Sequence, residues 1–81
     1  MTMKIKLKLF ATLREYLPKG NDGHSCTLDI SEETRVEDLL KEMNIPKDIP
    51  KIILVNGLQK GPDEFLKDGD TLSIFPPVAG G

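Results

Sequence analysis

The residues with the clearest chemical potential close the sequence, which ends Pro76-Pro77-Val78-Ala79-Gly80-Gly81. The two prolines fix φ and favour an extended exit from whatever precedes them. The five residues from Pro77 onward reach at most ~17 Å when extended, enough to enter the active site of a neighbouring protein. Because glycine has no Cβ, the two terminal glycines would let the backbone enter a narrow channel of a partner and leave the final carboxylate unshielded. We therefore predict that the Gly81 carboxylate is the reactive group, against the plain alternative of a frayed chain end.

This carboxylate needs an activating partner. An α-carboxyl group is ionised at neutral pH, and the resonance-stabilised anion is a poor electrophile. The sequence contains neither a GxxxxGK[ST] phosphate loop nor a GxGxxG motif that could bind a nucleotide. We expect no cofactor on this chain and expect a partner enzyme to adenylate Gly81 with ATP.

The elements that must hold the tail are predicted from apolar periodicity. Residues 4–9 alternate lysines with Ile, Leu and Leu, and residues 26–30 and 71–75 alternate as well, which indicates strands with one buried face. The run Ile52–Val55 is continuously apolar and predicts a central strand buried on both faces. Asn56-Gly57 predicts a tight turn. We expect the lysines of this first strand, Lys4, Lys6 and Lys8, either to face solvent or to contact an acidic groove of a partner.

The main helix is predicted by an apolar stripe at i, i+3, i+4 and i+7, formed by Val36, Leu39, Leu40 and Met43. Thr34 and Glu37 have the capping-box spacing at its start. Asn44 is the expected C-terminal cap, and Pro46 prevents continuation.

The order of elements predicts an α+β fold of the β-grasp type, in which one main helix packs on a mixed sheet. A short helix over residues 11–17, ended by Pro18, follows the first strand. We expect a single domain over residues 1–75, with residues 76–81 as an extended tail.

Charge and composition exclude several classes of protein. Eleven basic and thirteen acidic residues give a net charge of −2, which disfavours nucleic-acid binding. One cysteine, Cys26, and one histidine, His24, cannot make a disulfide or a structural metal site. No apolar run approaches the ~18 residues of a membrane span, and no secretory segment is found. We expect a cytoplasmic protein.

The cluster Asp22, His24, Ser25 and Cys26 resembles a catalytic triad only in composition, because adjacent strand residues point to opposite faces. Cys26 has a core-facing position, and we expect it to act as a small hydrophobe. The acidic residues Asp63, Glu64, Asp68 and Asp70 lack the spacing of a calcium loop and are predicted to lie in solvated turns.

The sequence resembles the small, ubiquitin-like subunit of molybdopterin synthase, one of the sulfur carriers that include the thiazole-synthesis carrier. The resemblance covers nearly the whole chain and rests on Leu9-Phe10-Ala11, Leu13-Arg14-Glu15, the helix stripe, Val55-Asn56-Gly57, Asp68-Gly69-Asp70 and Ile74–Gly81. The ending Phe-Pro-Pro-Val-x-Gly-Gly resembles the molybdopterin branch, because thiazole carriers typically lack the double proline.

The resemblance implies a carrier whose catalytic side chains lie on its partners. An adenylyltransferase related to the ubiquitin-activating enzyme would adenylate Gly81, and sulfur from a persulfide donor enzyme would displace AMP to leave a thiocarboxylate. The tail would then enter the large synthase subunit, in an assembly of two small and two large subunits. There it would donate sulfur to a cyclic pyranopterin phosphate, forming the dithiolene of molybdopterin.

The resemblance also implies that exposed apolar residues of the sheet dock these partners. Phe10 and Phe75 both fall off the buried alternation and are expected to lie near each other where the first and last strands pair. Leu58 is a further candidate for this patch. The alternative is that these side chains cover a small satellite core.

Two other functions use the same terminus. The first is a sulfur carrier for another pathway, such as thiazole, sulfur amino acid or tRNA thiolation. The second is a ubiquitin-like modifier whose Gly81 forms an isopeptide bond with a lysine. A plain structural domain is the weakest alternative.

Overall fold

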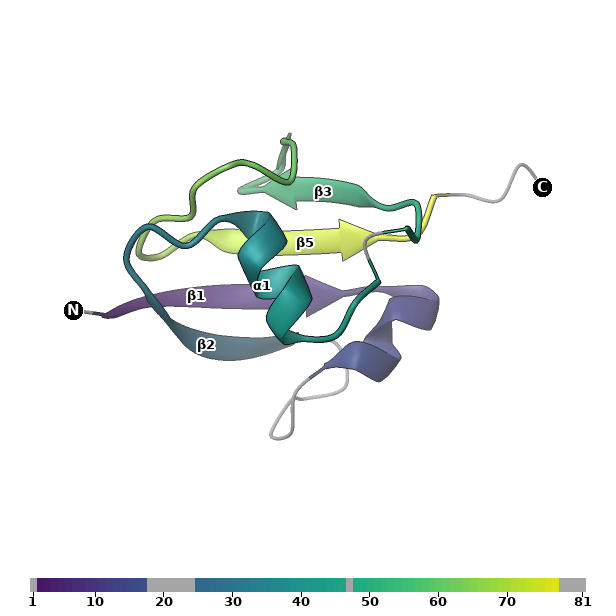
Figure 1. The fold of residues 1–81 in the computed structure, drawn as a ribbon, viewed down its shortest axis with the longest axis horizontal. Helices are drawn as coiled ribbons and strands as arrows, with labels where there is room; N and C mark the ends of the chain where they lie inside the picture. The colour runs from purple at the N-terminus through teal and green to yellow at the C-terminus, as the bar shows by residue number, and fades with distance from the viewer. Residues whose placement is uncertain (1, 18–24, 47, 78–81) are drawn as a thin grey trace.

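The computed structural model describes residues 2–17, 25–46 and 48–77, and these form one mixed sheet with a single α-helix on one face (Figure 1). The strands are β1 (Thr2–Leu9), β2 (Ser25–Ser31), β3 (Ile52–Val55), β4 (Leu58–Gln59) and β5 (Thr71–Phe75), in the spatial order β2-β1-β5-β3-β4. β1 runs parallel to β5, and the other neighbouring pairs are antiparallel. The predicted β-grasp architecture is confirmed.

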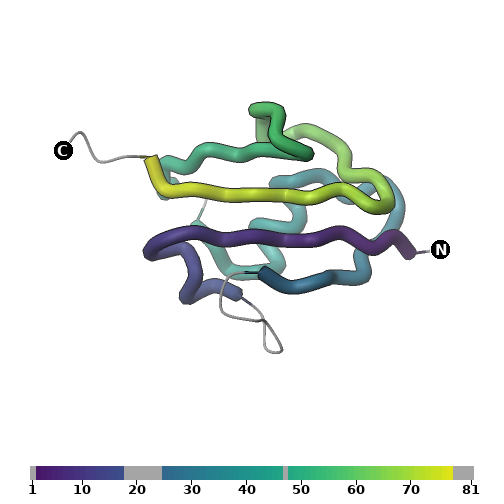
Figure 2. Tube along the Cα trace, turned by 180° about the vertical axis from the view of Figure 1, so that it is seen from behind, coloured from purple at the N-terminus to yellow at the C-terminus, as the bar shows by residue number. Residues whose placement is uncertain are grey.

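The core lies between the sheet and helix α1 (Val36–Glu42). In β1, Ile5, Leu7 and Leu9 are almost completely buried, as are Leu72 and Ile74 of β5. Figure 2 shows the sheet from behind, where no other element of the described chain covers it. Burial on one face explains why the alternating patterns predict these two strands correctly.

The start of α1 differs from the predicted capping box. The N-cap is Arg35, whose N–H donates to Asp38 Oδ2 at 3.0 Å. Thr34 instead donates its hydroxyl to the Ser31 carbonyl at 2.7 Å. The first helical amides, of Val36 and Glu37, donate to carbonyls of the loop at residues 62–64, at 2.9 and 2.8 Å. The capping prediction is wrong because a distant loop satisfies the donors that a local cap would serve.

The end of α1 confirms the role of Asn44. This residue has a φ of 62°, the left-handed conformation that asparagine tolerates. The Asn44 N–H donates to Lys41 O and the Ile45 N–H donates to Leu40 O, both at 3.0 Å. This pair of bonds is a Schellman motif, in which two otherwise unsatisfied helix carbonyls gain donors.

Strand β3 is buried on one face only, so the prediction of burial on both faces is wrong. Ile53 and Val55 are buried, whereas Ile52 is 36% exposed and Leu54 is half-buried. The helical layer covers a single face, and the other face of the sheet meets solvent.

The predicted Asn56-Gly57 turn is confirmed as type I′, because both residues have positive φ, 53° and 84°. The turn leads into β4, a short strand that the sequence analysis did not anticipate.

Two smaller predictions are settled by the same packing. The short helix after β1 is present as the 3₁₀ helix η1 (Ala11–Tyr16), with Leu13 buried. Cys26 packs half-buried against the core, which agrees with a structural role. Neighbouring Ser25 is buried, while Asp22 and His24 lie outside the described residues. Among the described helices, none has the length and apolar character that crossing a bilayer requires.

Candidate functional site

The chain leaves the sheet at the end of β5, beyond Phe75. Pro76 is half-buried and Pro77 is exposed, and both follow the strand without regular secondary structure. The rest of the predicted tail, Val78, Ala79, Gly80 and Gly81, lies outside the described residues, so the assignment of the reactive carboxylate stays a prediction.

Phe10 and Phe75 meet where the tail leaves the sheet, as the sequence analysis expected. Their rings stack with centroids 4.2 Å apart and planes 6° from parallel. Phe10 continues β1 in an extended conformation, and its N–H donates to the Ile74 carbonyl at 3.2 Å. Each ring follows a core-facing residue, Leu9 or Ile74, and so points to the uncovered face of the sheet.

Ile52 lies opposite Phe75 in the antiparallel pair of β3 and β5 and therefore shares its face. Phe10, Phe75 and Ile52 together form what we call the aromatic patch. Ile52 was not predicted to belong to this patch, because a strand buried on both faces would have hidden its side chain. The patch offers a partner an apolar surface beside the root of the tail.

Leu58 does not join the aromatic patch. It lies opposite Val55, so it shares the helix-facing side of the sheet, although it is 63% exposed at the sheet edge. The structure thus separates this residue from Phe10 and Phe75, and docking through Leu58 stays a prediction about a different surface.

A polar network fixes the start of β5, the strand that leads to Pro76 and Pro77. Asp70 is only 9% exposed, which contradicts the prediction of a solvated turn residue. Its two carboxylate oxygens accept from Asn56 Nδ2 and from the Lys67 N–H, both at 2.8 Å. Asn56 Oδ1 in turn accepts from the Thr71 N–H at 2.9 Å. The carboxylate is buried because it joins two turns that are distant in sequence.

The turn that carries Asp70 is also tied to β1. Asp68 Oδ1 accepts from the Lys4 N–H at 2.7 Å, and the Gly69 N–H donates to the Lys4 carbonyl at 2.7 Å. The Lys6 N–H donates to the Asp70 carbonyl at 2.9 Å. These bonds set the parallel register of β5 on β1, and the same register brings Phe75 to Phe10.

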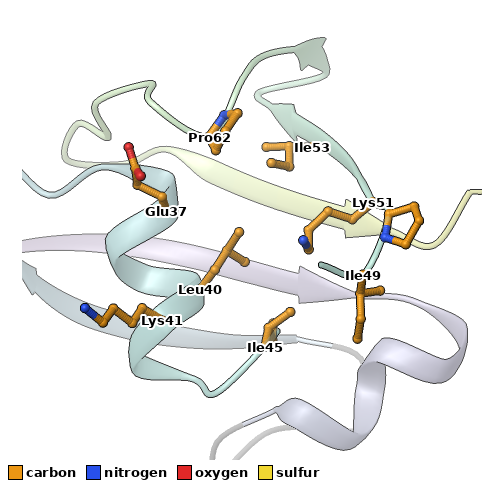
Figure 3. Close-up of a pocket in the computed structure, with 9 residues that line it drawn as sticks. Glu37, Leu40, Lys41, Ile45, Ile49, Lys51, Ile53 and Pro62 are labelled. Atoms are coloured by element: carbon orange, nitrogen blue, oxygen red, sulfur yellow. The ribbon is translucent and has the colours of Figure 1, made fainter. Parts of the chain in front are cut away.

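A pocket of about 650 Å³ lies on the helix-covered side of the sheet, between α1 and β3 (Figure 3). Figure 3 shows Leu40 projecting from α1 towards Ile53 of β3. Its lining is mainly apolar, with three charged side chains: Glu37, Leu40, Lys41, Ile45, Ile49, Pro50, Lys51, Ile53 and Pro62. Since Ile53 faces the core, the sheet separates this pocket from the aromatic patch. Within the described ranges, no three His, Cys, Asp or Glu side chains gather in a group that could hold a metal.

Comparisons with known proteins agree with this fold. A model of the ThiS family matches residues 7–81. Small archaeal modifier protein 3 from Haloferax volcanii is 26% identical, over 98% of this chain and 100% of the relative. The crystal structure of SAMP1 from Haloferax volcanii is 27% identical, covers 96% of this chain and 99% of its own, and superposes with a TM-score of 0.69.

A second solved structure is from Pyrococcus furiosus and is described as molybdopterin converting factor, subunit 1. It is 32% identical, with 94% of this chain and 99% of that chain covered and a TM-score of 0.68. These similarities extend over nearly the full length of the chain, and the match to the family model reaches residue 81.

Proposed function

Because this chain belongs to the ThiS family of ubiquitin-like carrier proteins, we propose that it carries sulfur for molybdopterin biosynthesis as a thiocarboxylate on Gly81. Members of this group are carriers rather than enzymes, so the catalytic side chains belong to the partners. An adenylyltransferase uses ATP to activate Gly81, and the outer sulfur of a donor enzyme's persulfide displaces AMP to form an acyl disulfide. A cysteine thiol then cleaves the S–S bond, which leaves the thiocarboxylate on Gly81 and a disulfide on the donor side. The large synthase subunit then uses the thiocarboxylate to add sulfur to a cyclic pyranopterin phosphate.

The observation that carries this proposal is the position of the double proline. Pro76 and Pro77 follow a strand whose start is held by the Asp70 network and whose end is held by the Phe10–Phe75 stack. A firmly held strand followed by two residues of fixed φ supports an arm that projects from the body of the protein. Such an arm suits a terminus that must reach into another protein.

Two findings favour the molybdopterin branch over other sulfur pathways. The ending Phe75-Pro76-Pro77-Val78-Ala79-Gly80-Gly81 has the form of that branch. The Pyrococcus furiosus relative is described as subunit 1 of molybdopterin converting factor, and this wording makes it one subunit of a complex. We propose that Phe10 and Phe75 contact the large subunit, with Leu58 a separate contact, in a heterotetramer in the cytoplasm.

The second candidate function is protein modification, because two of the Haloferax volcanii relatives are small archaeal modifier proteins. In this role, activated Gly81 forms an isopeptide bond with a lysine of another protein. Activation of the terminus is common to both functions, and only the acceptor differs.

Intact-mass measurement of the chain purified from its native cell tests the proposal. A sulfur-for-oxygen mass increment on the C-terminal peptide is expected for a carrier, and co-purification of a large subunit is expected for the molybdopterin pathway. A variant lacking Gly81 should form no adenylate and show no increment. Branched adducts without any thiocarboxylate would instead support the modifier function, and an AMP adduct on the truncated chain would refute both.

A further inference from the structure

The uncovered face of the sheet carries a row of lysines that leads to the aromatic patch. Lys4, Lys6 and Lys8 alternate along β1 with the buried residues, and Phe10 continues the same face. β1 lies in the interior of the sheet, between β2 and β5 (Figure 2). Side chains two residues apart on a strand are about 6.8 Å apart, so the row is a regular line of positive charge.

Only the first lysine of the row has a carboxylate partner among the described residues. Lys4 Nζ lies 3.3 Å from Asp29 Oδ1, and both side chains are well exposed. A second ion pair within the described ranges joins Arg35 and Glu37 at the start of α1 and does not involve the row. Lys6 and Lys8 are therefore not neutralised by a described carboxylate.

The cross-strand neighbours explain this lack of neutralisation. Lys6 lies between Thr27 of β2 and Thr71 of β5. Lys8, two residues further along β1, lies between Ser25 of β2 and Ser73 of β5. All four neighbours are uncharged, although the chain as a whole carries a net charge of −2. This part of the sheet therefore carries a local positive charge, in contrast to the net charge of the chain.

We propose that Lys6 and Lys8 bind carboxylates on the partner that adenylates Gly81, while the aromatic patch fills an apolar recess beside those carboxylates. This inference rests on the proposed function, and it holds for a sulfur carrier and a modifier alike, since both need adenylation. The ligand is an acidic protein surface with carboxylates spaced at about the 6.8 Å repeat of a strand. The row orients the partner, because it runs along β1 towards the point where the tail leaves the sheet.

A protein surface fits these observations better than a nucleic acid or a lipid headgroup. Two unpaired lysines release few counterions, and the net negative charge of the chain repels a polyanion. The neighbouring stack of two aromatic rings also favours a protein with a mixed polar and apolar contact surface.

Exposed charges at an interface act mainly on the rate of association and on its dependence on salt. We therefore expect the double variant Lys6→Glu/Lys8→Glu to lower the second-order rate constant for adenylation about tenfold at low ionic strength. The difference should shrink towards the wild-type value in 0.5 M salt, where the Debye length is only a few ångströms. The rate at saturating carrier should change much less, because neither lysine belongs to the C-terminal segment that is adenylated.

The assay follows ATP-dependent formation of the Gly81 adenylate by the purified adenylyltransferase of the same organism, over a range of carrier and salt concentrations. The matched control is Lys41→Glu/Lys67→Glu, which makes the same change in net charge at two exposed lysines outside the row. Circular dichroism verifies the fold of both variants. The control should stay within about twofold of wild type, as expected for charges away from the interface.

Equal rates for the two double variants at low salt would overturn the inference while leaving the proposed function intact. Failure of wild type itself to be adenylated would refute the proposed function and the inference together. If the Lys6/Lys8 variant lost binding to anionic vesicles or to an oligonucleotide but was adenylated normally, the row would be a polyanion site and the proposal would be wrong.

Discussion

Removal of the Asp70 carboxylate is the sharpest test of how this fold holds its tail. Asp70→Ala deletes two acceptors, one for Asn56 Nδ2 and one for the Lys67 N–H, both at 2.8 Å. Hydrogen bonds to charged groups contribute about 1.5–3 kcal/mol each, and a buried donor left unpaired adds its own desolvation cost. Partial access of water to the opened site offsets some of this loss. We expect the free energy of unfolding to fall by about 2–4 kcal/mol.

Such a loss is large for a domain of this size, since total stabilities are about 5–15 kcal/mol and small domains lie near the lower end. The assay is urea denaturation followed by far-UV circular dichroism, because the chain contains no tryptophan. The slope of unfolding free energy against urea should stay constant, which would show that stability and not compactness changed.

The matched control is Asp68→Ala in the same turn. Asp68 is exposed and, among the described residues, accepts one hydrogen bond, from the Lys4 N–H, so its removal should cost no more than about 1 kcal/mol. If the two variants were equally stable, or if Asp70→Ala stayed within about 0.5 kcal/mol of wild type, the buried network would not be what holds the start of β5.

Further variants probe the core, the turn and the aromatic patch. Leu72→Ala should destabilise the protein by about 2–5 kcal/mol in the same denaturation assay, because Leu72 is completely buried between β5 and the helical layer; a loss below 1 kcal/mol would contradict that packing. Gly57→Ala should cost about 1 kcal/mol through its φ of 84° alone, since a Cβ there would meet no atom within 4 Å, and Gly57→Asn should cost less. For Phe10→Ala and Phe75→Ala, a double-mutant cycle should give a coupling of about 0.5–1.5 kcal/mol in unfolding free energy, and additive effects would mean that the rings do not interact. Phe75→Ala should also weaken binding of the large subunit in a calorimetric titration, and undiminished binding would remove the docking proposal.

Local patterns in the sequence were sufficient for most of the elements and for the buried faces of β1 and β5. Alternation in residues 4–9 and 71–75 identified which side chains enter the core, because a strand covered on one face repeats every two residues. Asn56-Gly57 and Asn44 were informative for the same reason, since each residue must adopt a positive φ that most side chains resist. The expected meeting of Phe10 and Phe75 followed from pairing the first and last strands.

The errors share one cause, which is that the deciding partner lies far away in the chain. Thr34 is of a residue type that often caps helices, yet carbonyls of residues 62–64 accept the hydrogen bonds of the first helix amides. Asp70 is of a residue type that usually lies in solvated turns, yet it is buried because the Asn56 side chain donates to it from the turn after β3. Ile52 was expected in the core, yet its face of the sheet has no covering layer in the described structure.

What the sequence determined by itself is therefore most of the local conformations, together with the prediction of a reactive carboxylate behind two prolines. The tertiary structure decided which residues lie together on the sheet: it placed Ile52 beside the stacked rings, put Leu58 on the other face, and lined up uncharged neighbours around Lys6 and Lys8. The physical reason is that backbone conformation depends on neighbours within a few residues, whereas burial and charge pairing depend on strand register, which is set only when distant segments meet.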